Sequence, residues 1–265
     1  MTTKVMDRLT DRPETEPLGC RPVVCLLGGP YLVVGGNRWG VPEGCQRLLA
    51  FLAMNGGRVL RRRAAGLLWP EVEEERAAGN LRSALWRLRA SGADVVESDK
   101  SAVWLHPGAD TDVACVHEWA ARLVGGQPLP DDLHTLWWHP EVVDLLPGWY
   151  DEWIVFARER LRQQVLHALE CLSALLVQEG RYADGIEAAL LAVEIEPLRE
   201  SAQRRLIEAH LAEGNAAEAH RALRSYGGLL RRDLGIRPSP GLVALVPGWP
   251  SALDRGWSSA VTDSP

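Results

Sequence analysis

The sequence lacks the long apolar segments and paired cysteines by which several classes of protein are recognised. No apolar run approaches the roughly 18 residues that a transmembrane helix needs, and the first twenty residues hold no apolar core of signal-peptide length. The five cysteines are scattered and form no Cys-x-x-Cys pair. We therefore expect a cytoplasmic protein with reduced thiols, no membrane contact, no structural zinc and no disulfide framework.

Charge is distributed unevenly along the 265 residues, whose net charge is −6. Residues 21–110 hold 12 Lys and Arg against 9 Asp and Glu, a net charge of +3, whereas residues 111–265 hold 14 against 22, a net charge of −8. An acidic chain can therefore contain a mildly basic N-terminal domain. The length and a hydrophobic content of 46% fit two globular domains.

The N-terminal pattern predicts strands, then three helices, then a hairpin. Gly28-Gly29-Pro30 lies between two β-rich runs, and Asn55-Gly56-Gly57 should end the first helix. In the second helix, Ala64, Leu67 and Leu68 should face inward. This order is that of a winged helix with an extra N-terminal sheet. The expected segments are a hairpin at 23–34, a turn at 35–37, helices at 44–54, 60–69 and 74–91, and a second hairpin at 94–106.

From Val113 onward the pattern predicts helices only, and Gly180 and Gly214 lie 34 residues apart between similar helical segments. A period near 34 indicates a tetratricopeptide-like array, to which the preceding long helices must add the rest of the stack. Such an array can serve as a packing or dimerisation domain for the N-terminal domain, or bind a peptide or small molecule in its concave face. We favour protein–protein contact. The expected helices span 113–124, 131–146, 149–179, 182–195, 198–213 and 216–234.

The third helix, with the segment NLRSALWRLRASG, raises the question of function. Leu81, Leu85 and Leu88 form one apolar stripe with Ala77 and Ala78, so the opposite face is exposed. Arginine, asparagine and serine are side chains that bind base edges and phosphates, although arginines on a helix surface are often merely solvated. Our candidate DNA contacts on this helix are Arg76, Asn80, Arg82, Ser83, Trp86, Arg87 and Arg89. Flanking phosphate contacts are expected from Arg61, Arg62, Arg63 and Lys100.

These segments resemble those of a known family of regulators. The runs LLGGPYLVVGG, RLLAFLAMNGGRVLRRRAAGLLWP and NLRSALWRLR are similar to the OmpR-type winged helix of the Streptomyces antibiotic regulatory protein (SARP) family. The later motifs WYDEW, EPLRES, AEGN and LGIRPSP resemble the bacterial transcriptional activator domain (BTAD) of that family. The chain departs from the family pattern at Gly29, at Arg61-Arg62-Arg63, at Gly79 within the third helix, and at Ala90-Ser91.

The resemblance implies a mainly α protein with a small β part. A winged helix-turn-helix at 21–112 should be followed by an all-α tetratricopeptide-like domain at 113–246, with a disordered arm at 1–20 and a flexible tail at 247–265. The family activates antibiotic gene clusters in actinobacteria. Its members bind direct repeats near the −35 promoter element side by side and contact RNA polymerase through sigma region 4 or the alpha C-terminal domain. The recognition helix then corresponds to about 75–90 and the wing to about 94–106.

Two other classes of function, an adaptor and an enzyme, are alternatives to a DNA-binding regulator. A helical-repeat adaptor whose winged helix no longer binds DNA fits the low net charge of the first domain and Gly79. An enzyme has little support, because His134 and His139 beside Asp131, Asp132 and Glu141 match no metal-ligand spacing. The glycine-rich run at 28–36 lacks the lysine of a phosphate loop. We expect no catalysis, cofactor or metal, and interpret Trp149 and Trp153 as packing anchors rather than a partner surface.

Overall fold

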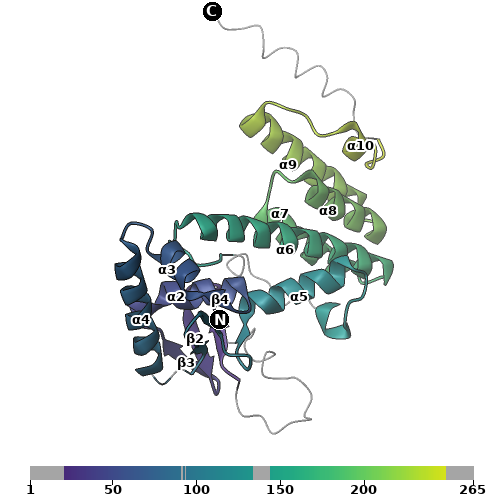
Figure 1. The fold of residues 1–265 in the computed structure, drawn as a ribbon. Helices are drawn as coiled ribbons and strands as arrows, with labels where there is room; N and C mark the ends of the chain where they lie inside the picture. Colours follow the sequence, from purple (N-terminus) through teal and green to yellow (C-terminus); the bar gives the residue numbers. More distant parts are fainter. Residues whose placement is uncertain (1–20, 91, 93, 134–143, 249–265) are drawn as a thin grey trace, which may run out of the picture. The chain divides into compact units, whose positions relative to one another are not determined.

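A computed structural model describes residues 21–248 apart from 91, 93 and 134–143 (Figure 1). The predicted arm at 1–20 and most of the predicted tail at 247–265 lie outside these residues. Contacts divide the chain into two compact units, residues 1–125 with 136–165 and residues 126–135 with 166–265. The domain boundaries 21–112 and 113–246 stay a prediction.

The first unit begins with the predicted hairpin. Strands β1 (Val23–Cys25) and β2 (Tyr31–Val34) pair antiparallel, and β3 (Asn37–Gly40) continues the sheet, so the order is β3-β2-β1-β7. The turn predicted at 35–37 is made by Gly35 and Gly36, whose positive φ angles of 62° and 74° favour glycine, and Asn37 already starts β3. Strand β7 (Asp110–Thr111) pairs parallel with β1 and brings the end of the winged helix back to its start.

Three helices follow, as the sequence predicted: α2 (Glu43–Asn55), α3 (Arg61–Leu68) and α4 (Glu74–Ala90). Gly56 ends α2 with a φ of 58°, and Glu74 and Glu75 lie in the first turn of α4, where the helix dipole favours carboxylates. The inward position predicted for Leu67 is wrong. Ala64, Ala65 and Leu68 form the buried side of α3, which leaves the Leu67 side chain on the opposite side and exposed.

The predicted second hairpin is present as β5 (Val96–Ser98) and β6 (Ala102–Leu105). A two-residue strand that the sequence did not indicate, β4 (Val59–Leu60), pairs with β6 and completes a three-stranded sheet in the order β4-β6-β5. Since β4 leads directly into α3, this sheet ties the hairpin to the beginning of the helix-turn-helix.

Helix α5 (Asp112–Val124) starts with a buried carboxylate that joins it to the first sheet. One Asp112 carboxyl oxygen accepts hydrogen bonds from the backbone N–H groups of Leu26 and Leu27, at 2.8 and 2.9 Å. Thr111 caps the helix by accepting a hydrogen bond from the Ala114 N–H at 3.0 Å. Burial raises the pKa of Asp112 to about 6, although these hydrogen bonds favour its charged form.

The prediction of a helix at 131–146 is wrong at both of its ends, which are the parts of this segment that the structure describes. Residues 130–133 form a single 3₁₀ turn, η1 (Pro130–Leu133), and Leu145 forms an isolated antiparallel bridge with Leu27. The Leu146 N–H donates to the Leu26 carbonyl at 3.0 Å, and both Leu145 and Leu146 are fully buried. Tertiary burial beside Leu26 and Leu27, which follow β1, therefore outweighs the local helical pattern here. The middle of the predicted helix lies outside the described residues.

Four later helices agree closely with the sequence pattern: α6 (Glu152–Gln178), α7 (Tyr182–Ile195), α8 (Glu200–Glu213) and α9 (Ala216–Leu234). The short α10 (Pro240–Val243) was not predicted. Gly180 follows α6 and Gly214 follows α8, each with a positive φ angle. In the second unit, α7 packs on α8 and α8 on α9, around a core that includes Ile207, Leu223 and Tyr226. The tetratricopeptide-like repeat stays a prediction.

Two helical glycines should respond oppositely to alanine. At Gly79 in α4, an added Cβ meets only the Arg82 Nη2 at 3.7 Å, so Gly79→Ala should raise the free energy of unfolding by about 1 kcal/mol. At Gly185 in α7, a Cβ meets the Val177 Cγ2 at 2.8 Å and the Ser173 carbonyl at 3.1 Å, so Gly185→Ala should lower it by about 1–3 kcal/mol. Denaturant unfolding measures both; a stabilising Gly185→Ala would contradict this packing.

The buried Asp112 makes stability depend on pH. Its pKa is raised from 3.8 to about 6, so its contribution is fully present below its ordinary pKa and is lost as pH rises through the folded value. Asp112→Asn removes the titrating group. The unfolding free energy of the wild-type chain relative to this variant should therefore fall between about pH 4 and pH 7, by about 3 kcal/mol at most. A difference that is independent of pH would show that Asp112 keeps its ordinary pKa.

Candidate nucleic-acid interface

Helix α4 has one buried face and one exposed face, as its periodicity predicted. The buried side chains are Ala77, Leu81, Ala84, Leu85 and Leu88. These face α2 and α3, which α4 contacts (Figure 1). The opposite face exposes Arg76, Arg82, Ser83, Trp86, Arg87 and Arg89, whereas Asn80 is half-buried.

Four of the predicted contact residues lie together on this outward face. Arg82, Ser83, Trp86 and Arg87 line one shallow, open depression. The Trp86 side chain is 71% exposed, which is unusual for an indole, so a large apolar surface lies between the guanidinium groups. The Arg87 Nε donates to the Ser83 carbonyl at 3.3 Å, and its guanidinium lies against Gly44 at the first turn of α2, where a Cβ would come within 2.8 Å of Nη1.

Three other predicted contact residues bind within the protein. The Arg62 Nε lies 2.6 Å from a Glu74 carboxyl oxygen, so that its charge is neutralised locally. The Arg89 Nη2 donates to the Ser98 hydroxyl at 3.0 Å and links α4 to β5. The Arg61 Nη1 donates to the Asp99 carbonyl at 2.9 Å. Arg61 and Arg89 therefore hold the hairpin, and we assign them a structural part in the interface.

Several of the predicted contact cations have no counter-ion within the described residues. Within the part of the chain that the structure describes, Arg63, Arg76, Arg82 and Lys100 form no ion pair, and all four are exposed. Arg76 and Arg82 lie on α4, Arg63 on the first turn of α3, and Lys100 at the tip of the hairpin. Their positive charge is therefore available to a polyanion.

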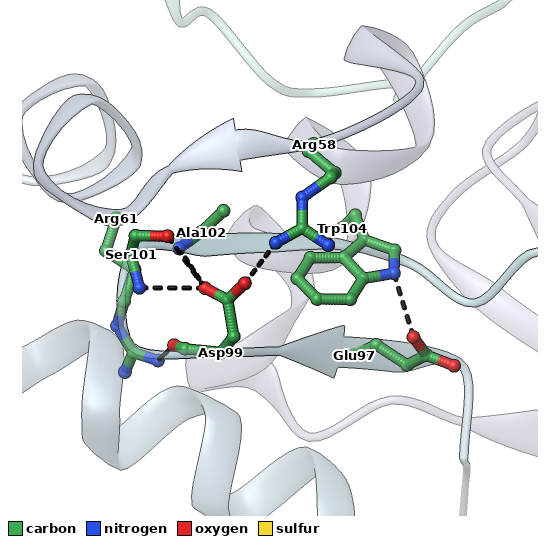
Figure 2. Close-up of polar contacts among 7 residues, drawn as sticks. All are labelled: Arg58, Arg61, Glu97, Asp99, Ser101, Ala102 and Trp104. Atoms are coloured by element: carbon green, nitrogen blue, oxygen red, sulfur yellow. Dashed lines mark hydrogen bonds and ion pairs between the residues drawn. The ribbon is translucent and has the colours of Figure 1, made fainter.

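The hairpin tip contains an ordered polar cluster that sequence reasoning missed in part (Figure 2). Arg58 forms an ion pair with Asp99 and stacks its guanidinium over the Trp104 ring, 3.8 Å from the centroid. The Trp104 indole N–H donates to Glu97 at 2.9 Å. Arg58 lies 41 residues before Asp99, so no local spacing pattern pointed to this pair.

The described residues give no support to the metal-binding and catalytic sites considered from the sequence. Among the residues that the structure describes, no cluster of His, Cys, Asp or Glu could hold a metal ion; His134, His139 and Glu141 lie outside them. Asp132 is buried and accepts a hydrogen bond from the Leu129 N–H at 2.8 Å. The described cysteines are free thiols, and burial raises the pKa of Cys25 to about 12. No described helix is long and apolar enough to cross a bilayer.

Of the two tryptophans predicted to be packing anchors, Trp153 in the first turn of α6 is confirmed as one. The Trp153 ring packs edge-on against Phe51 with 5.7 Å between centroids, and Trp149 is half-buried. Asp151 forms an ion pair with Arg47 of α2. In contrast, Tyr150 is exposed and takes no part in this packing.

The fold and the surface together define a class of protein. A helix-turn-helix closed by a β-hairpin wing, with an unpaired cationic face on its last helix, is the arrangement by which winged helices enter the major groove. A guanidinium group can donate two parallel hydrogen bonds to guanine, and a hydroxyl can form a hydrogen bond with a base or a phosphate. A lysine on a wing can contact the phosphate backbone of DNA.

The relationships of the chain agree with this class. Residues 131–247 match the family described as the bacterial transcriptional activator domain. The family consists of transcriptional regulators and not of enzymes. No curated protein is detectably similar in sequence.

Among solved structures, the fold resembles that of Mycobacterium tuberculosis EmbR in complex with a low-affinity phosphopeptide. The TM-score is 0.63 and the identity 23%, over 85% of this chain and 64% of EmbR. The chain thus spans less than two thirds of the EmbR chain that it matches. This likeness shows that the two chains share a fold.

Truncating one guanidinium should distinguish base reading from phosphate binding. We expect Arg87→Ala to weaken binding to a specific site by about 1–3 kcal/mol and to affect random DNA less, if Arg87 donates to a base edge. An equal loss on specific and random DNA would make it a phosphate contact. Fluorescence anisotropy with both duplexes measures this. Arg224→Ala, an exposed arginine of α9, is the matched control and should change neither affinity.

Proposed function

We propose that this protein activates transcription of a secondary-metabolite, antibiotic-type gene cluster by binding direct repeats near the −35 promoter element. The observation that carries the proposal is the outward face of α4. Arg76 and Arg82 are unpaired there, Trp86 and Ser83 lie between guanidinium groups, and the wing adds Lys100. The activator domain at 131–247 and the SARP resemblance supply the promoter context.

The protein would act by occupying its DNA site, without catalysing a chemical step. Helix α4 enters the major groove, and Arg63 and Lys100 contact phosphates on either side. Direct repeats require protomers that face the same way, so one protomer meets the next through two different surfaces. Because phosphate contacts release counter-ions, affinity should fall steeply with salt even though the whole chain carries a net charge of −6.

Activation would then depend on the helical part of the chain. Bound beside the −35 element, the protein presents its acidic C-terminal part to RNA polymerase, for which sigma region 4 and the alpha C-terminal domain are the expected contacts. Residues 111–265 carry a net charge of −8, which keeps this part away from DNA and available to a partner. The proposed place of action is the cytoplasm, at the nucleoid.

The test is binding of the full chain to promoters from its own genomic neighbourhood. We expect nanomolar, salt-dependent binding to one promoter, a footprint over a direct repeat, and increased transcript from that promoter with RNA polymerase in vitro. Weak binding that ignores sequence would contradict the proposal and favour the adaptor, whose winged helix docks proteins. The salt series separates the two, because only a DNA reader gives a steep slope.

Lys100 should behave as a phosphate contact. Lys100→Ala is expected to weaken binding about fivefold at roughly 0.15 M salt, equally for all sequences, and to lower the slope of log affinity against log salt by about one. An unchanged slope would remove Lys100 from the interface. The matched control is Arg221→Ala, which removes an exposed cation that is paired with Glu218 on α9 and should leave the slope unchanged.

A further inference from the structure

The turn at the tip of the wing is organised around one carboxylate. The Asp99 Oδ1 accepts hydrogen bonds from the backbone N–H groups of Ser101 and Ala102, both at 2.7 Å, and from the Ser101 hydroxyl at 3.0 Å. The Asp99 N–H in turn donates to the Ala102 carbonyl at 3.0 Å. These contacts are those of an Asx-turn, in which the side chain replaces a backbone partner. They hold the pKa of Asp99 at about 2, so it is ionised throughout the physiological range.

The other oxygen of this carboxylate binds an arginine from outside the hairpin. Arg58, in the loop before β4, pairs with the Asp99 Oδ2 while its guanidinium lies flat over Trp104 (Figure 2). Trp104 is itself held by the hydrogen bond from its indole N–H to Glu97. The guanidinium therefore cannot swing away without losing both its stacking partner and its counter-ion.

Arg61 holds the same turn from the start of α3. Its side chain donates to the Asp99 carbonyl, and its backbone N–H donates to the Ser101 carbonyl, both at 2.9 Å. Two arginines from one short segment thus hold the tip: Arg58 by the Asp99 side chain and Arg61 by the turn backbone. Lys100 is the residue between these anchors, and its ammonium forms no ion pair with a described residue.

We propose that Asp99 is a positioning residue for DNA binding, which fixes the direction in which Lys100 leaves the wing by joining the turn to Arg58. The inference rests on the proposed function, because it assigns a part within the DNA-binding surface. An anionic side chain beside a phosphate contact repels DNA, so its electrostatic effect and its positioning effect have opposite signs. This opposition makes the two effects separable.

Asp99→Asn is the first variant to measure on the full chain. The amide oxygen of asparagine can still accept from the Ser101 and Ala102 N–H groups, whereas the ion pair with Arg58 is lost. Electrostatics alone predicts tighter binding, since one negative charge has been removed near the phosphates. Positioning predicts weaker binding, about fivefold at roughly 0.15 M salt, with the salt slope lowered by about one, because the Lys100 contact is lost.

Asp94→Asn is the matched control. Asp94 is an exposed carboxylate at the other end of the same hairpin and forms no ion pair with a described residue, so its removal changes the charge without loosening the tip. We expect its binding to be unchanged or slightly tighter. Equal weakening by both asparagine variants would overturn the positioning role, as would Asp99→Asn binding at least as tightly as the wild type.

A double-mutant cycle with Lys100→Ala tests whether Asp99 acts through the lysine. If it does, Asp99→Asn should have little further effect once Lys100 is alanine, so the two losses do not multiply. Losses that multiply fully would overturn the proposal, because Asp99 would then act independently of Lys100. If the wild-type chain does not bind DNA, the proposed function itself is overturned. If the wild-type chain binds DNA but the losses multiply, only the positioning role of Asp99 is overturned.

Hydrogen exchange in the absence of DNA supplies a readout that does not depend on the promoter. The amides of Ser101 and Ala102 should exchange faster in Asp99→Asn than in the wild type, while Lys100→Ala should leave them unchanged. Unchanged exchange in Asp99→Asn would overturn the claim that the Arg58 pair orders the tip. Circular dichroism of each variant checks that the fold is retained.

Discussion

The arrangement of the first unit depends on burial of one face of α4. Ala77, Leu81, Ala84, Leu85 and Leu88 are removed from water, and the helix cannot rotate without exposing them. Burial of this face fixes the opposite face outward, with its guanidinium groups and the exposed indole of Trp86. The surface that we propose to contact DNA is thus a consequence of core packing, because its side chains lie on the face of α4 opposite the buried one.

The two sheets of the first unit hold the wing and join the end of the winged helix to its start. Strand β4 joins the wing to the beginning of α3, and β7 returns the chain to β1, where Asp112 binds the backbone of Leu26 and Leu27. Arg61 and Arg89 bind the hairpin from α3 and α4. The wing is therefore held at several points, which lowers the entropy that ordering it on a ligand would cost.

Periodic features were predictable from the sequence, and pairings between distant residues were not. The stripe of Leu81, Leu85 and Leu88 indicated helix α4 and its buried face. Gly180 and Gly214 marked helix ends because glycine adopts positive φ at little cost. Leu145 instead forms an isolated bridge with Leu27, since backbone partners and burial there outweigh local propensity. Likewise Arg58 and Asp99 are brought together only by the pairing of β4 with β6.

The central claim is that the outward face of α4 contacts DNA, and site-specific crosslinking tests it most directly. A photoreactive phenylalanine analogue at Ser83, exposed on α4, is compared with the same analogue at Ser225, exposed on α9, in the full chain with promoter DNA. We expect crosslinks from position 83 that an excess of the same duplex removes, and none from position 225. Crosslinks from neither position, or from both equally, would contradict a DNA-reading face on α4.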